Sequence, residues 1–271
     1  MCERLTPDNF TINILGSTTT EPSSLLPFNA VVKDQNGVAQ SGRKVTISVD
    51  VQEGTGGHLH TENRPKGTFT CSSALGTSPA ICTLTTDSSG QAPFEFVATP
   101  ISGTHTITAT CDKCDDTASK SVDVKVAGLE PISPSALYAL YESDGSVIGA
   151  VKSRHESNHY LTPTAANMLL VIAINCYHQY PNGPVLHVND ASLMWGGVLD
   201  FDAEAEWNTP HKEHRRGTVV DIRANSKTGA IPSGNFDAFI QLAKDRGVHA
   251  KIHSQGQANQ HFHVRLLNRS E

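Results

Sequence analysis

Alternating apolar and polar residues dominate the first half of the chain. Val45–Val51 alternates along its whole length, and Phe28–Lys33 is followed by the turn residues Asp34–Gly37. Similar runs, bounded by Gly, Ser, Asp or Asn, recur at Thr83–Val97, Gly103–Thr110 and Lys120–Val126. Short strands at this spacing, with no helical pattern between them, predict an all-β sandwich over residues 1–127.

The pattern changes after residues 128–135, a Pro- and Ser-rich stretch that we interpret as a linker. Thr162 and Pro163 are typical of a helix start ahead of the apolar run Ala165–Tyr177, and Ser233 is typical of a second helix start. Strand-forming runs lie at Leu186–Leu193, Thr218–Arg223, Val248–His253 and His261–Leu266. Helices combined with a small antiparallel sheet predict an α+β domain over residues 136–271.

The composition indicates a soluble globular protein, because 38% of the 271 residues are hydrophobic. A net charge of −6 gives no electrostatic case for nucleic acid as a partner. The longest apolar run, Met168–Ile174, is far too short to span a bilayer, so no transmembrane segment is expected. The sequence shows no signal peptide, so secretion would require its prior removal. Whether Cys2 was a lipidation site stays open.

Five of the six cysteines lie before residue 115. Cys71 and Cys82 flank a Ser- and Pro-rich loop, while Cys111 and Cys114 close a tight turn. In a Thr- and Ser-rich β-domain we interpret these pairs as two disulfides, which implies an oxidising compartment. Redox chemistry at the second pair is disfavoured because no helix follows it, and a zinc ribbon is disfavoured by the spacing of the first pair. Cys176, within an apolar run, is expected to be a buried free thiol.

Histidines and an aspartate recur on two predicted strands of the second domain. Asp221 lies on one strand, with His214 just before it, and His263 lies on the other. Because side chains alternate along a strand, two neighbouring strands could direct these three side chains at one point. Two imidazoles and one carboxylate are a common protein ligand set for catalytic Zn²⁺, with water in the fourth position. The alternative is a set of unrelated histidines, since the chain has 13.

A second histidine pair, His58 and His60, lies on a Gly-rich loop of the predicted sandwich. No carboxylate or third ligand lies at useful sequence spacing from it. We therefore interpret the pair as packing the loop rather than binding a metal.

The motif His214-Arg-Arg-Gly-Thr-Val-Val-Asp221 resembles the His-x-x-Gly-x-x-x-Asp zinc motif of the D-Ala-D-Ala metallopeptidases. His211-x-x-His214 together with His261–Leu266 resembles the penicillin-insensitive murein endopeptidases. Both families belong with lysostaphin to the peptidoglycan-cleaving zinc peptidases, and the likeness covers residues 155–266. The turn pattern of residues 34–45 and Gly103–Ala109 resembles bacterial immunoglobulin-like domains of surface proteins.

The resemblance implies roles for five histidine and aspartate residues. His214, Asp221 and His263 would bind Zn²⁺. His261 would be a catalytic residue that stabilises an oxyanion or passes a proton. His211 would be a further catalytic residue, with an exposed loop histidine as the alternative.

Other positions follow the resemblance less closely. Arg215 and Arg216 are candidates for binding the carboxylates of an anionic stem peptide, or are surface arginines. Ala258 stands where the murein endopeptidases carry another histidine, and whether His253 acts instead stays open. The Glu base of the D-Ala-D-Ala peptidases is replaced by His261, so Glu-based proton transfer is not carried over. Glu213 is expected to face solvent, with a contact to a ligand residue left open.

We therefore predict zinc-dependent hydrolysis of peptide bonds in bacterial peptidoglycan by a metal-activated water. The protein would be secreted, periplasmic or on the cell surface, with peptidoglycan or its stem peptides as partner. One alternative is a non-catalytic cell-wall-binding or adhesin-like protein built on a peptidase fold. Another is a zinc peptidase of a different substrate class. Endopeptidase and carboxypeptidase activity are not distinguished, and the oligomeric state stays open.

Overall fold

A computed structural model describes residues 9–70, 79–141, 155–180, 185–200, 207, 213–224, 231, 233–257 and 259–267. The chain divides into two units. Met1–Thr55 with Glu62–Lys125 forms the first, and Gly56–Thr61 with Val126–Glu271 forms the second. The segment Gly56–Thr61 therefore belongs with the second unit, although its sequence position lies inside the predicted sandwich domain.

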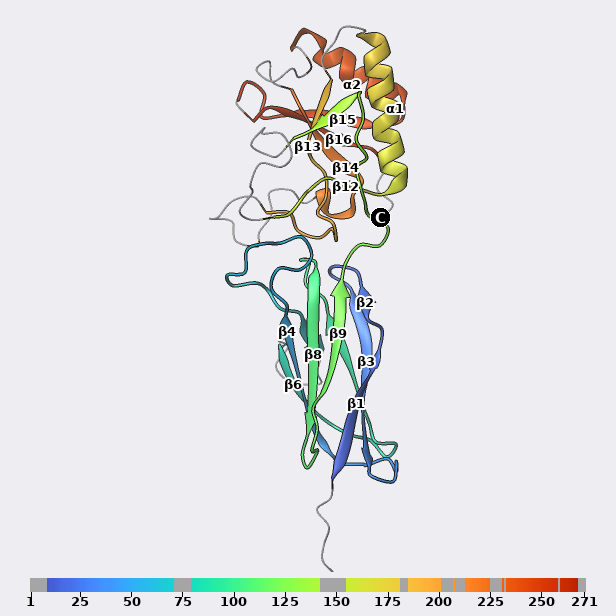
Figure 1. Cartoon of the computed structure of the whole chain (residues 1–271), viewed down its shortest axis with the longest axis vertical. Helices are drawn as coiled ribbons and strands as arrows, with labels where there is room; N and C mark the ends of the chain where they lie inside the picture. Colours follow the sequence, from blue (N-terminus) through green and yellow to red (C-terminus); the bar gives the residue numbers. More distant parts are fainter. Residues whose placement is uncertain are drawn as a thin grey trace, which may run out of the picture. The chain divides into compact units, whose positions relative to one another are not determined.

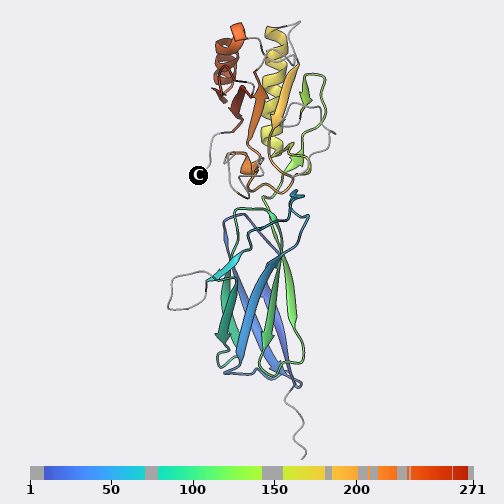
Figure 2. The same cartoon turned by 90° about the vertical axis from the view of Figure 1, so that its left-hand side faces the viewer.

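The first unit is a sandwich of two β-sheets whose strands run side by side (Figures 1 and 2). One sheet has the order β1 (Phe10–Gly16), β3 (Leu25–Asp34), β7 (Gln91–Val97), β5 (Thr68–Thr70). The other has the order β2 (Thr19–Thr20), β9 (Ala118–Val124), β8 (Gly103–Cys111), β4 (Lys44–Val51), β6 (Ile81–Thr85). All neighbouring strands are antiparallel except β2 and β9, which are parallel.

The core of the sandwich follows from the alternation of side chains along each strand. In β4 and β8 every second residue is buried, and Ile47 and Ile107 are fully enclosed. Phe69 and Phe96 fill the core from the other sheet, with their ring centroids 6.2 Å apart. Apolar burial of this kind is the main term that stabilises a two-layer fold, and it confirms the immunoglobulin-like sandwich expected from the periodicity.

The cysteines that the structure describes in the first unit are oxidised. Cys111 and Cys114 form a disulfide, with their Cα atoms 5.2 Å apart. Cys82 is disulfide-bonded, while Cys71 lies outside the described residues. Cys176 of the second unit is a buried free thiol, as expected, and burial raises its pKa to about 11.

The second unit is built on a five-stranded sheet. Its order is β11 (Tyr138–Leu140), β13 (Leu186–Asp190), β14 (Val219–Arg223), β16 (His261–Arg265), β15 (His249–His253). β11 is parallel to β13, and the other pairs are antiparallel. The short strands β10 (Glu130–Pro131) and β12 (Tyr160–Leu161) pair separately. The helices are α1 (Pro163–Gln179) and α2 (Phe236–Asp245), with 3₁₀ turns η2 (His214–Arg216) and η4 (Ser233–Asn235).

The two α-helices lie beside the sheet (Figure 1). They share one apolar core with it. Thr162 begins α1 by accepting a hydrogen bond at its hydroxyl from Ala165 N at 3.3 Å, and Pro163 occupies the first turn. Leu169 of α1 and Phe239 of α2 are enclosed in the core that also holds Ile222, Phe262 and Val264 of the sheet. Because side chains alternate across a strand, Asp221 and His263 point away from this core. Among the described residues, no helix is long and apolar enough to cross a membrane.

The predicted fold class is wrong for the second domain. The described part of the chain contains 16 strands and only two α-helices, so the protein is mostly β with an immunoglobulin-like sandwich. The expected α+β zinc-peptidase domain with a small antiparallel sheet is not found, since the sheet is mixed and has five strands. Sequence periodicity could not reveal the parallel β11, because that strand is only three residues long. The predicted linker also differs: it contributes β10 and the buried Ile132.

Phe262→Ala is expected to destabilise the second unit by about 3–5 kcal/mol, because it removes a fully buried ring. That ring lies 4.7 Å from Phe239 and 5.2 Å from Phe236, centroid to centroid. Both tryptophans lie in the second unit, so urea unfolding followed by tryptophan fluorescence reports on it. Tyr177→Ala, at a side chain that is 56% exposed, is the control and should cost less than about 0.5 kcal/mol. Equal midpoints for the two variants would contradict the assigned core.

Non-reducing peptide mapping is expected to recover Cys82 linked to Cys71. The reason is that Cys82 is disulfide-bonded, Cys111 and Cys114 bond to each other, and Cys176 is free, which leaves Cys71 and Cys2 as candidate partners. Of these two, Cys71 flanks the same loop as Cys82. A free thiol at Cys71 after aerobic purification would rule this pairing out.

Candidate metal centre

The structure brings the three predicted metal ligands together on the face of the sheet that the helices do not cover. Asp221 on β14 lies directly opposite His263 on β16 in the antiparallel register. His214 reaches the same point from η2, which ends at Gly217 in a left-handed conformation with φ of 64°. A Cβ at this glycine would lie 2.3 Å from Leu129 Cδ2 and 3.2 Å from the Leu161 backbone. The glycine therefore allows the tight turn that places His214 just before β14.

The spacing of the ligand atoms suits a metal ion. His214 Nε2 lies 3.3 Å from Asp221 Oδ2, and His263 Nδ1 lies 2.9 Å from Asp221 Oδ1. One ligand atom from each residue lies within 4.8 Å of the others. Ligand atoms bound at about 2.0–2.1 Å around a tetrahedral zinc are separated from each other by roughly 3.3–3.4 Å. The three side chains can therefore hold Zn²⁺ with small adjustments.

Each histidine ligand is oriented by a hydrogen bond from its other ring nitrogen. His214 Nδ1 lies 2.7 Å from the carbonyl oxygen of Ala191, and His263 Nε2 lies 3.0 Å from Glu213 Oε2. Donation at these nitrogens leaves His214 Nε2 and His263 Nδ1 as the metal-facing atoms. Arg265 in turn donates to both oxygens of Glu213, at 2.5 and 2.7 Å. Glu213 thus supports a ligand instead of facing solvent as expected.

The electrostatics of the buried ligands favour an ionised carboxylate. Burial opposes charge on both His214 and Asp221, but their mutual attraction outweighs it. The result is a raised pKa for His214 and an Asp221 pKa well below its usual range. Hydrogen bonds from Arg265 likewise hold the pKa of Glu213 below its usual range. Asp221 is therefore available as an anionic ligand at neutral pH, and a bound cation would replace the imidazolium charge beside it.

Two further histidines border the centre. His261 Nδ1 lies 2.7 Å from the Asn259 carbonyl oxygen, and its Nε2 lies 3.5 Å from Asp221 Oδ2. The His253 ring centroid lies 5.5 Å from that of His261 and 5.2 Å from that of His263. His253, whose role the sequence left open, therefore lies beside the site.

The remaining predicted site residues lie near the centre in sequence but make no described contact with it. Arg215 is half-buried and Arg216 is exposed, both on η2 next to His214. His211 lies outside the described residues.

The packing role assigned to His58 and His60 is incomplete. The structure places them beside a third histidine, His155, and a carboxylate, Asp200. Both lie far from the loop in the sequence. Contacts between segments so distant along the chain leave no local signal, so only the fold could reveal this group.

No family model matches the chain, and no curated protein matches it. Solved structures that match include the CARDB domain of a Pyrococcus furiosus protein in complex with di-metal ions, which is 16% identical with a TM-score of 0.28 over 45% of this chain and 97% of that one. The Escherichia coli adhesin FdeC is 13% identical with a TM-score of 0.28, over 49% of this chain and 38% of that one. The PKD domain of an M14-like peptidase from a Thermoplasmatales archaeon is 15% identical with a TM-score of 0.24, over 44% of this chain and 96% of that one.

The predicted membership of the peptidoglycan-cleaving zinc peptidases is therefore wrong. No such family is matched, and the similar solved structures are β-domains of the immunoglobulin-like, CARDB and PKD kinds. The predicted descriptions of the protein as a hydrolase and a metallopeptidase are therefore also unsupported. The predictions of an immunoglobulin-like domain and of a disulfide agree with the structure. The physical reason is that a few ligands spaced along neighbouring strands satisfy the geometry of a metal. That demand is met on many folds, so the motif does not establish a family.

Asp221→Ala is expected to lose one equivalent of zinc relative to the parent protein, because it removes the carboxylate that both ligand histidines face. His261→Ala should retain that equivalent, since His261 borders the centre without completing the ligand set. Metal content by mass spectrometry after zinc loading and dialysis checks both variants. If His261→Ala loses the metal and Asp221→Ala keeps it, the assignment of ligands is wrong.

Proposed function

We propose that this chain is an adhesin-like, cell-wall-binding protein whose second unit holds Zn²⁺ and uses it to bind acidic peptides such as peptidoglycan stem peptides. The observation that carries the proposal is the convergence of His214, Asp221 and His263 on one point, with both histidines oriented by hydrogen bonds. Three protein ligands leave a tetrahedral metal one position for an external group.

The centre is partly exposed at one edge, which supports access of an external ligand. The side chains of His263 and His261 are 13% and 18% exposed to solvent, whereas those of His214 and Asp221 are buried. A carboxylate oxygen is a normal zinc ligand, so an anionic peptide is a suitable occupant of this position. Arg216, exposed on η2 two residues after His214, offers a guanidinium for a second carboxylate of the same peptide.

The state of Glu213 supports binding without turnover. A metal-bound water needs a proton acceptor to attack a peptide bond, and a carboxylate with a pKa near neutrality serves that purpose well. Both oxygens of Glu213, which contacts His263, are instead bound by Arg265. Glu213 is therefore a weak proton acceptor.

The first unit supports a location outside the cytoplasm. A disulfide between Cys111 and Cys114, together with oxidised Cys82, is typical of secreted, periplasmic or surface proteins. An immunoglobulin-like sandwich in the same chain as a ligand-binding unit suits a protein that binds a cell wall.

Zinc-loaded protein is expected to bind a synthetic peptidoglycan stem peptide, measured by isothermal titration calorimetry. Removal of zinc with a chelator, or Asp221→Ala, should weaken binding at least about tenfold, equal to about 1.4 kcal/mol, because the metal-bound carboxylate loses its partner. His249→Gln, at an exposed histidine of β15, is the control and should bind as the parent does.

The same samples, incubated with purified peptidoglycan and examined by mass spectrometry, should release no new fragments. Zinc-dependent release of fragments would show that the site cleaves its ligand and would overturn the binding-only proposal. Equal affinity with and without zinc would show that the metal does not take part in recognition.

A further inference from the structure

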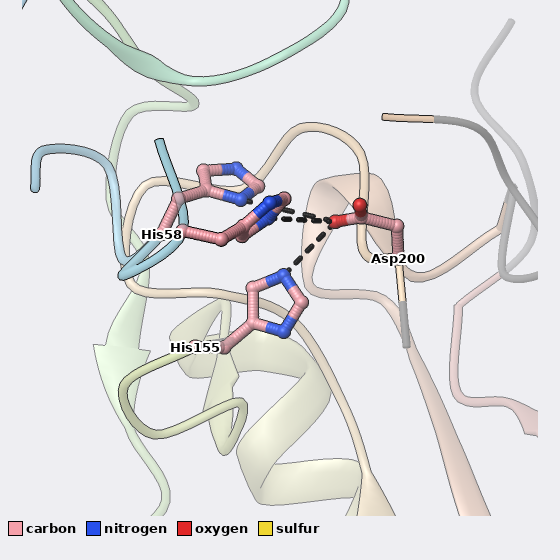
Figure 3. A group of neighbouring side chains, drawn as sticks. His58, His155 and Asp200 are labelled. Carbon is pink, nitrogen blue, oxygen red and sulfur yellow. Dashed lines mark hydrogen bonds and ion pairs between the residues drawn. The ribbon is translucent and has the colours of Figure 1, made fainter. Parts of the chain in front are cut away.

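A second group of metal-ligating side chains lies within the second unit, separate from the centre on β14 and β16. It consists of His58, His60, His155 and Asp200. His58 and His60 come from the segment Gly56–Thr61, which belongs to this unit. Figure 3 shows the side chains of His58 and His155 pointing toward the carboxylate of Asp200.

The geometry is that of four ligands around one point. His155 Nε2, His60 Nε2 and His58 Nδ1 lie 3.0, 3.4 and 3.9 Å from the same oxygen, Asp200 Oδ1. These distances bracket the roughly 3.3–3.4 Å expected between neighbouring ligand atoms of a tetrahedral zinc. The three imidazole rings are also evenly spaced, with centroids 5.1–5.5 Å apart.

Burial distinguishes this group from the first centre. All four residues are buried, and the side chains of His58 and Asp200 are fully enclosed. Four protein ligands complete a tetrahedral shell and leave no position for water, which is the pattern of structural rather than catalytic zinc sites. Imidazole nitrogen with carboxylate oxygen suits Zn²⁺ among the common divalent ions.

The surroundings hold the ligands in place. Trp207 stacks on His60 with ring centroids 4.0 Å apart and planes inclined by 20°. The Trp207 backbone N–H donates to Asp200 Oδ2 at 3.0 Å, so the carboxylate is fixed through one oxygen while the other faces the histidines. A backbone bridge joins His58 to His155, and Glu156 N donates to Gly57 O at 2.9 Å. These contacts align segments that are distant along the chain, as expected around a metal.

Hydrogen bonding to the carboxylate alone accounts less well for the arrangement. Of the three histidine distances to Asp200 Oδ1, the 3.0 Å from His155 is a normal hydrogen bond, whereas the 3.9 Å from His58 is too long for one. A single carboxylate oxygen offers about two lone-pair sites, so it cannot accept good hydrogen bonds from three imidazoles at once. A central cation bound by the ring nitrogens and by this oxygen accounts for the convergence of all four side chains.

We propose that His58, His60, His155 and Asp200 form a structural zinc site that fixes Gly56–Thr61 against His155, Asp200 and Trp207 within the second unit. The site is independent of the centre formed by His214, Asp221 and His263.

The first test is zinc content by mass spectrometry after loading and dialysis. The parent protein is expected to hold two zinc ions per chain. His60→Phe, which keeps a ring stacked on Trp207, and Asp200→Asn, which keeps an oxygen for the Trp207 N–H, should each hold one. Asp221→Ala should also hold one, and Asp221→Ala combined with His60→Phe should hold none. His249→Phe, at an exposed histidine of the same unit, should retain two.

These variants separate the two sites. Loss of one zinc in Asp221→Ala, together with two retained in both His60→Phe and Asp200→Asn, would overturn the structural site while leaving the first centre intact. If His60→Phe and Asp200→Asn each lose one zinc while Asp221→Ala loses none, the structural site is supported and the first centre is overturned.

The second test measures metal binding beside Trp207 directly. It also includes a control that identifies variants that do not fold. In a protein carrying Asp221→Ala and Trp195→Phe, Trp207 is the remaining tryptophan, and it lies against His60. Co²⁺, which absorbs in the visible when tetrahedral, should quench Trp207 fluorescence and saturate at one equivalent. Adding His60→Phe should abolish the quenching, with circular dichroism checking that the fold is retained. Absence of saturable quenching in the folded protein with His60 intact would overturn the proposal.

Discussion

The buried carboxylate of Asp221 is the constraint on which the site of the second unit depends. An ionised carboxylate enclosed by protein is strongly destabilising unless it is paired and hydrogen-bonded. Here His214 and His263 supply the pairing from two different elements. Their positions follow from the register in which Asp221 faces His263. A slip by one residue would place Val220 and Val264 on this face, so the core and the site fix the same register.

The sheet of the second unit therefore has two faces with opposite chemistry. Ile222 and Phe262 point into the core shared with α1 and α2, whereas Asp221 and His263 point to the polar face. The strands act as the rigid support that keeps ligand atoms within a few ångströms of each other before any metal binds. Such preorganisation limits the ordering that binding must impose. The ion pair between Glu213 and Arg265 extends the support outward from His263.

The two histidine groups of this unit differ in a way that bears on their roles. The centre at Asp221 has three ligands, two of them supported by hydrogen bonds, and a partly exposed edge at His263. The group at Asp200 has four buried ligands packed against Trp207. An incomplete shell is suited to exchange an external ligand, and a complete shell is suited to hold chain segments together. In the first unit, the disulfide between Cys111 and Cys114 fixes a turn by covalent means.

The sequence by itself determined much of the local structure and indicated the cluster of His214, Asp221 and His263. Alternation specified the sandwich strands, and Thr162 with Pro163 specified the start of α1, because both signals act between near neighbours along the chain. His214, Asp221 and His263 were recognisable because two of them lie seven residues apart around a glycine turn and the third lies on an adjacent strand. The family drawn from that motif was wrong, since ligand spacing reflects the geometry of a metal rather than descent. Only the tertiary structure decided the parallel pairing of β11, the role of Glu213, and the meeting of His58 and His60 with His155 and Asp200. In each case the partners are distant in sequence, and nothing but the packed chain brings them together.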